Sequence, residues 1–116
     1  MNGSMKMNRS DIATVYVAFA NSAKGKRSPV YIIQENNKTI HFFSITSKYQ
    51  TKSEKIKKQY VEIRDWEQAG LRKKSWIDIG TVNEIPKEKK GIIWKKIGVL
   101  SENDLKRLES KLYNKE

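Results

Sequence analysis

The chain has 116 residues, a length that suits a single domain. It carries 24 Lys and Arg against 13 Asp and Glu, a formal net charge of +11, and it has no cysteine. The lack of cysteine excludes disulfides and thiolate metal sites, and no apolar run approaches the roughly 20 residues that span a bilayer. The charge favours a polyanionic partner: nucleic acid first, an acidic protein second and an anionic membrane third. A lysine-rich surface that serves only solubility stays an alternative.

Residues 1–7 contain no hydrophobic signal region, and we expect them to be disordered or derived from an expression tag. The single domain is then expected to span residues 8–116. Without a signal region, a membrane span or cysteine, the expected location is the cytoplasm.

Apolar and β-branched residues predict five strands and, over residues 92–97, a sixth short apolar segment. The five expected strands cover residues 11–19, 30–34, 39–46, 60–64 and 75–82. Asn36 to Lys38 signals a turn, so the second and third strands should form a hairpin. Pro29 cannot donate a hydrogen bond to a neighbouring strand and is expected where the second strand starts. The lysine-rich segment from Ser47 to Lys58 is expected to be a mobile loop.

Two helices are expected, one very short and one at the end of the chain. Asp65 resembles an N-cap and Gly70 a stop, which leaves about one helical turn between them. Ser101 caps the final helix, which has an apolar stripe of Leu105, Leu108 and Leu112 that should pack on the sheet. The sequence therefore predicts a mainly β protein, a small barrel with a C-terminal helix.

Few residues suit metal or nucleophilic catalysis. His41 is the only histidine, and no acidic cluster has the spacing of metal ligands. His41 lies within an expected strand, where a structural role is the more common one. There is no phosphate-binding loop of the P-loop type, and we expect neither a metal nor another cofactor.

The remaining chemistry is metal-free action on a polyanion. RNA can be cleaved by its own 2′-hydroxyl when a protein positions the chain and stabilises the phosphorane with cations and hydroxyls. Lys26 and Arg27 precede the second strand, and Thr46, Ser47 and Lys48 follow the third. A hairpin brings these two ends together, so the five side chains should be neighbours. Alone this is a weak signal, because Thr46 and Ser47 are also ordinary turn residues.

Aromatic residues give a second, weaker indication of nucleic-acid binding. Trp76, Trp94 and Tyr49 could stack against bases. Their more common role is in the core or at a dimer contact, because aromatic side chains bury a large area.

Several short motifs occur in the order found in one family of proteins. They are Ser10-Asp11-Ile12, Lys26-Arg27-Ser28-Pro29-Val30, Ile45-Thr46-Ser47-Lys48, Gly70-Leu71 with Ser75, and Ile97-Gly98-Val99-Leu100-Ser101. Together they resemble the MazF/PemK family of toxin endoribonucleases, over residues 10 to 112. Each motif is weakly specific, whereas their order and spacing are fairly specific.

The resemblance implies an SH3-like barrel with helices, usually a symmetric homodimer. It also implies metal-free cleavage of single-stranded RNA to a 2′,3′-cyclic phosphate, and a cognate acidic antitoxin that blocks the RNA site. Thr46 matches the catalytic threonine or serine of the family. The family's catalytic arginine directly precedes the proline, whereas this chain has Ser28 there and Arg27 one residue earlier.

The residues expected to take part are therefore of two kinds. Arg27 and Thr46 are the expected catalytic pair. The expected RNA-binding residues are Lys24, Lys26, Ser28, Ser47, Lys48, Lys52 and Lys55. The later strand also departs from the family, because Gly80-Thr81-Val82-Asn83-Glu84 replaces a pattern that is often Asp-Gln-Ile-Arg-Thr.

Three functions stay open at this point. The first is a ribonuclease toxin, and the second is a nucleic-acid-binding barrel without catalysis, which the serine at position 28 favours. The third is an interaction module whose positive charge serves only an acidic protein partner.

Overall fold

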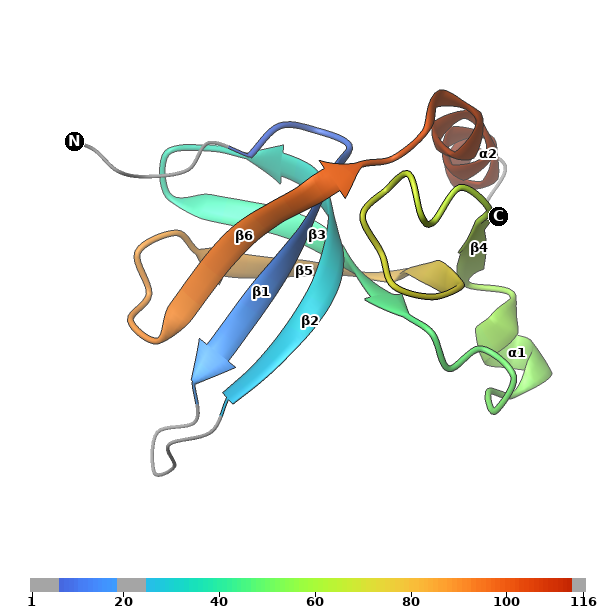
Figure 1. The fold of residues 1–116 in the computed structure, drawn as a ribbon, viewed down its shortest axis with the longest axis horizontal. Coiled ribbons are helices and arrows are strands. Elements are labelled where there is room, and N and C mark those ends of the chain that lie inside the picture. Colours follow the sequence, from blue (N-terminus) through green and yellow to red (C-terminus); the bar gives the residue numbers. More distant parts are fainter. Residues whose placement is uncertain (1–6, 19–24, 114–116) are drawn as a thin grey trace.

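The computed structural model describes residues 7–18 and 25–113. Within these ranges the chain forms one antiparallel sheet and two helices (Figure 1). The strands are β1 (Asp11–Ala18), β2 (Gly25–Glu35), β3 (Thr39–Thr46), β4 (Tyr60–Ile63), β5 (Ser75–Pro86) and β6 (Ile92–Val99). The helices are α1 (Glu54–Lys57) and α2 (Glu102–Tyr113).

The six strands of the described residues lie in the order β4-β5-β3-β2-β1-β6. The last strand therefore pairs with the first, and β4 and β6 form the two edges. The sheet is strongly coiled but not closed, and its architecture matches the predicted mainly β, barrel-like fold with a C-terminal helix (Figure 1). Neither described helix is long and apolar enough to cross a membrane.

The predicted hairpin of the second and third strands is present. β3 covers the predicted residues, and it pairs with β2 from Val30 opposite Ser44 to Glu35 opposite Ile40. β2 begins earlier than predicted, at Gly25, so Pro29 lies inside the strand and not at its start. Residues 25–29 pair with β1 alone, because the pairing of β2 with β3 begins only at Val30, and a strand with one neighbour tolerates proline.

Two local predictions were wrong, the short helix after Asp65 and the loop without secondary structure from Ser47 to Lys58. Residues 64–70 form consecutive turns and no helix, although Gly70 ends them with a φ of +85°. The Asp65 carboxylate accepts a hydrogen bond from the Ser101 hydroxyl at 2.6 Å and so serves tertiary structure. The segment expected to be a loop contains α1, whose N-cap Ser53 accepts the Ile56 N–H at 3.3 Å.

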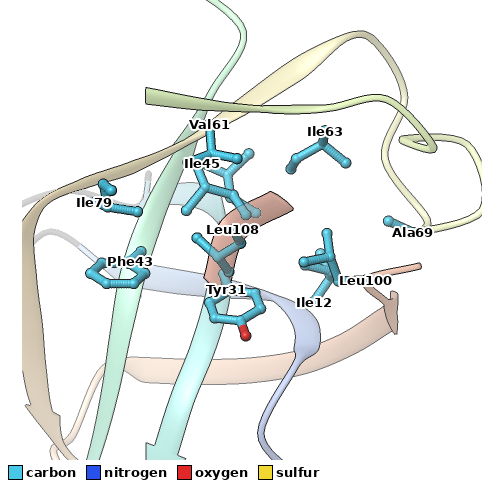
Figure 2. Close-up of a cluster of buried hydrophobic side chains, with 11 residues drawn as sticks. Ile12, Tyr31, Phe43, Ile45, Val61, Ile63, Ala69, Ile79, Leu100 and Leu108 are labelled. Atoms are coloured by element: carbon cyan, nitrogen blue, oxygen red, sulfur yellow. The ribbon is translucent and has the colours of Figure 1, made fainter. Parts of the chain in front are cut away.

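Two hydrophobic clusters form the core. The first lies between the sheet and α2, with Leu108 of α2 at its centre near Tyr31 and Ile45 (Figure 2). Leu105 packs against this cluster, as the apolar stripe predicts, whereas Leu112 is 38% exposed. Complete burial of a leucine side chain contributes about 1.5–3 kcal/mol to folding. The second cluster consists of Met7, Ala13, Val15, Val30, Ile32, Ile40 and Phe42, so the core includes a residue placed outside the expected domain.

Hydrogen bonds around one buried carboxylate fix α2 against the end of β4. Asp104 accepts the backbone N–H groups of Arg64 at 3.1 Å and Asp65 at 2.8 Å, and it also pairs with Arg107. Arg107 in turn donates to the Glu62 carbonyl at 2.7 Å. We call these residues, with Ser101, the α2–β4 junction.

Candidate functional site

A groove of about 780 Å³ lies where β3 ends beside the first residues of β2. Parts of β1, β2, β3 and β6 and the segment before β5 form its walls. Its cationic lining residues are Lys26, Arg27, Lys48, Arg72, Lys73 and Lys95. The described lining contains no Asp or Glu, so the groove presents concentrated positive charge. We call it the basic groove.

The hairpin brings the two predicted groups of residues to this groove. Lys26, Arg27 and Ser28 line it from β2, and Thr46, Ser47 and Lys48 line it from the end of β3. The β2–β3 pairing ends at Val30 opposite Ser44, so Ser28 and Thr46 both lie two residues beyond its last pair.

Arg27 and Ser28 are adjacent in β2, so their side chains lie on opposite faces of the strand, because side chains alternate along a strand. It is paired with Tyr16 of β1, and its guanidinium carbon is 5.8 Å from the centroid of that ring. Arg27 Nη1 also donates to Thr14 Oγ1 at 3.4 Å. Arg27 therefore borders the groove from the β1 side, whereas Thr46 borders it from β3.

The Thr46 hydroxyl is held in place by its own backbone. Thr46 Oγ1 accepts the Lys48 N–H at 3.0 Å, which fixes the oxygen at the end of β3. A hydroxyl that accepts one hydrogen bond keeps its own O–H available as a donor. Thr46 is half-buried, and Ser47 and Lys48 beside it are exposed.

The segment from Gly70 to Ser75 forms another wall of the groove. Gly70 packs so closely on β6 that a Cβ there would lie 2.2 Å from the Ile97 carbonyl oxygen. At its other end the Ser75 hydroxyl donates to the Lys73 carbonyl at 2.8 Å. The exposed side chains of Arg72 and Lys73 lie between these two anchors.

Sequence reasoning missed Arg72, Lys73 and Lys95 as residues of the site. The first two lie between Gly70-Leu71 and Ser75, motifs already recognised, so their place within a shared motif was a usable signal. Lys95 enters through the pairing of β6 with β1, where it lies opposite Thr14. That pairing joins distant parts of the chain and leaves no local pattern.

The other predicted RNA-binding residues do not line the groove or are not described. Lys24 lies outside the described residues. Lys55 is exposed on α1, and Lys52 is half-buried with its N–H bonded to the Tyr49 carbonyl at 3.1 Å. The described part of the chain places neither of these two lysines in the groove lining.

The aromatic residues pack mainly against one another. Tyr49 stacks on Trp76 with ring centroids 4.6 Å apart, and Trp76 is 8% exposed. Trp94 packs edge-on against Phe42 of the second cluster at 5.6 Å. These contacts agree with the structural role that was the more common expectation.

Two shifted pKa values occur outside the basic groove, on β4. Burial raises the pKa of Tyr60, and the nearby Asp78 carboxylate raises it further. The Lys74 ammonium, which lies 3.0 Å from the Glu62 carboxylate, lowers the pKa of Glu62 despite its partial burial. Among the described residues, no group of three His, Cys, Asp or Glu side chains could hold a metal ion.

Comparison with known proteins assigns the family. A model of the PemK-like, MazF-like toxins of type II toxin-antitoxin systems matches residues 8–114. The chain belongs to this family. The resemblance drawn from the sequence motifs is thereby confirmed, and the partner of such a toxin is a cognate antitoxin. No individual curated protein matches the chain.

Proposed function

We propose that this toxin is a metal-independent endoribonuclease that cleaves single-stranded RNA in the basic groove. The observation that carries the proposal is that Arg27 and Thr46 line one groove together with five further cations, and that its described lining has no acid. A cationic groove attracts the phosphate backbone, and a fixed hydroxyl can select one linkage within it.

In the proposed reaction the RNA supplies its own nucleophile. The 2′-oxygen bonds to the adjacent phosphorus while its proton passes to water. The bond from phosphorus to the 5′-oxygen breaks, and that oxygen leaves with the bonding electron pair and takes a proton from water. The products are a 2′,3′-cyclic phosphate and a 5′-hydroxyl, with no net change in protons.

Each side chain has a role that its placement supports. The Thr46 hydroxyl donates to a non-bridging phosphate oxygen, since its acceptor side is engaged by the Lys48 N–H. Arg27 supplies positive charge to the phosphorane from the β1 side. Lys26, Ser28, Ser47 and Lys48 hold the neighbouring phosphates.

The partners proposed from the sequence extend this function. We propose that the toxin acts in the cytoplasm as a homodimer. We also propose that its antitoxin is acidic and blocks the basic groove. The net charge of +11 supports an acidic partner, because the same field that attracts RNA attracts carboxylates.

The test is cleavage of a mixed single-stranded RNA pool in EDTA, with analysis of the new ends. We expect cyclic phosphate and 5′-hydroxyl ends, and a rate at least about 100-fold lower for Arg27→Ala. Arg9→Ala is the matched control, because Arg9 lines a different cavity and pairs with Glu109. Intact RNA after long incubation with the wild-type toxin would contradict the nuclease.

One observation favours a second candidate, RNA binding without cleavage. The residue directly before Pro29 is Ser28, and the nearby guanidinium of Arg27 is engaged by Thr14 and Tyr16. In that case the RNA stays intact, and binding to it weakens as the salt concentration rises.

A further inference from the structure

We propose that Arg72 is a further catalytic residue of the basic groove, one that binds the non-bridging oxygens of the phosphorane. This inference rests on the proposed nuclease function. It starts from Arg27, the arginine that β2 contributes to the groove lining, whose guanidinium is engaged by Thr14 and Tyr16 on the β1 side. A phosphorane held by Thr46 therefore needs positive charge from another direction.

Strand pairing shows which segment lies beside the end of β3. Thr46 is paired with Trp76 of β5, and extending that register places Ser47 opposite Ser75. The residues just before Ser75 consequently pass close to the end of β3. They connect it to Gly70, which packs on Ile97 of β6. Arg72 lies midway along this connection and lines the groove.

The segment that carries Arg72 is held at several points. The Leu71 N–H donates to the Trp66 carbonyl at 3.0 Å, and the Ser75 hydroxyl holds the Lys73 carbonyl. Gly70 has no room for a side chain against β6. A cation presented from an anchored segment loses little freedom when it meets its ligand, which is what pre-organised electrostatic stabilisation requires.

Arg72 suits this role better than its two basic neighbours. Lys74 turns away from the groove, with its ammonium 3.0 Å from Glu62 and 5.6 Å from the Trp76 ring. Lys73 offers a single compact ammonium. The guanidinium of Arg72 is planar and can donate two parallel hydrogen bonds to two phosphate oxygens. It reaches the groove from the segment between β4 and β5, whereas Arg27 lies on β2 beside β1.

The test compares cleavage with binding. Arg72→Ala is expected to slow cleavage of a defined RNA about 100-fold. Its affinity for the same RNA with a 2′-deoxy nucleotide at the cleaved position should change less than fivefold, because that RNA never forms the phosphorane. Arg72→Lys should recover only part of the rate. Arg64→Ala is the matched control, since Arg64 is an exposed arginine that pairs with Glu62 outside the groove lining.

Three results overturn the inference, and they can be told apart. If the wild-type toxin cleaves RNA and Arg72→Ala cleaves it within threefold of that rate, Arg72 has no catalytic role while the proposed function stands. If the wild-type toxin cleaves no RNA, the proposed function fails and the role of Arg72 fails with it. An equal loss of cleavage and of 2′-deoxy RNA binding would make Arg72 a binding residue only. Arg72 is exposed, so its removal should leave the fold intact.

Discussion

The basic groove and the α2–β4 junction both gather charged side chains, but they use charge in opposite ways. At the junction Asp104 is 2% exposed, and it is satisfied by two backbone N–H groups and by Arg107. In the groove six cations line a cavity of about 780 Å³ without an acid in the described lining. Charge that is satisfied within the protein holds the fold together, whereas charge left facing a cavity is available to a ligand.

The largest effect is expected at the junction. Asp104→Ala leaves Arg107 and two backbone N–H groups without their acceptor, so we expect a loss of about 3–5 kcal/mol in the free energy of unfolding. Urea titration measures it. Glu102→Ala is the control, because its pair with Lys106 is exposed and spans 3.9 Å. The comparison fails if Asp104→Ala is as stable as this control.

A smaller effect is expected in the groove, on binding and not on stability. Lys95→Ala should weaken RNA binding several-fold at low salt. It should make the slope of log affinity against log salt shallower by about 0.7, the value for one phosphate contact on a single strand. Binding titrations at several salt concentrations test this. Lys106→Ala on α2 is the control, and an equal change in both variants would contradict a localised site.

The smallest effect concerns pH and the pair formed by Glu62 and Lys74. Because the pKa of Glu62 is lowered in the folded protein, its contribution to stability is complete above the unfolded value of about 4.3. That contribution is lost as the pH falls through the folded pKa. Lys74→Met keeps the aliphatic stem but removes the charge, so its unfolding free energy should fall less steeply in this acid range. If the unfolding free energy of the wild-type protein and that of Lys74→Met depend on pH in the same way, the pair of Glu62 and Lys74 is excluded as the cause of the acid loss.

Local patterns in the sequence predicted the parts of the fold that depend on neighbours along the chain. The turn at Asn36 to Lys38 and the alternation around it determine a hairpin, and β3 was predicted residue for residue. The start of β2 was missed because residues 25–29 are strand only through their pairing with β1. The turns at 64–70 were predicted as a helix because Asp65 resembles a cap. Its carboxylate instead accepts from Ser101, 36 residues away.

The same distinction between local patterns and long-range contacts applies to the candidate site. Hairpin geometry was enough to bring Arg27 and Thr46 to one groove. The side of the groove on which each of these two side chains lies depends on the strand register at Val30, which the sequence does not reveal. Arg72 and Lys95 reach the groove through β6, and the contacts that place them join residues 27 and 81 positions apart, Gly70 with Ile97 and Thr14 with Lys95.

The pairing of β6 with β1 also has a consequence for the order of synthesis. β1 leaves the ribosome before the other described strands of the sheet, yet β6, the strand that completes its far side, is the last of them to emerge. Until then the segment carrying Arg72 lacks the Ile97 backbone on which Gly70 rests. A nascent chain therefore has no finished groove until β6 has emerged from the ribosome.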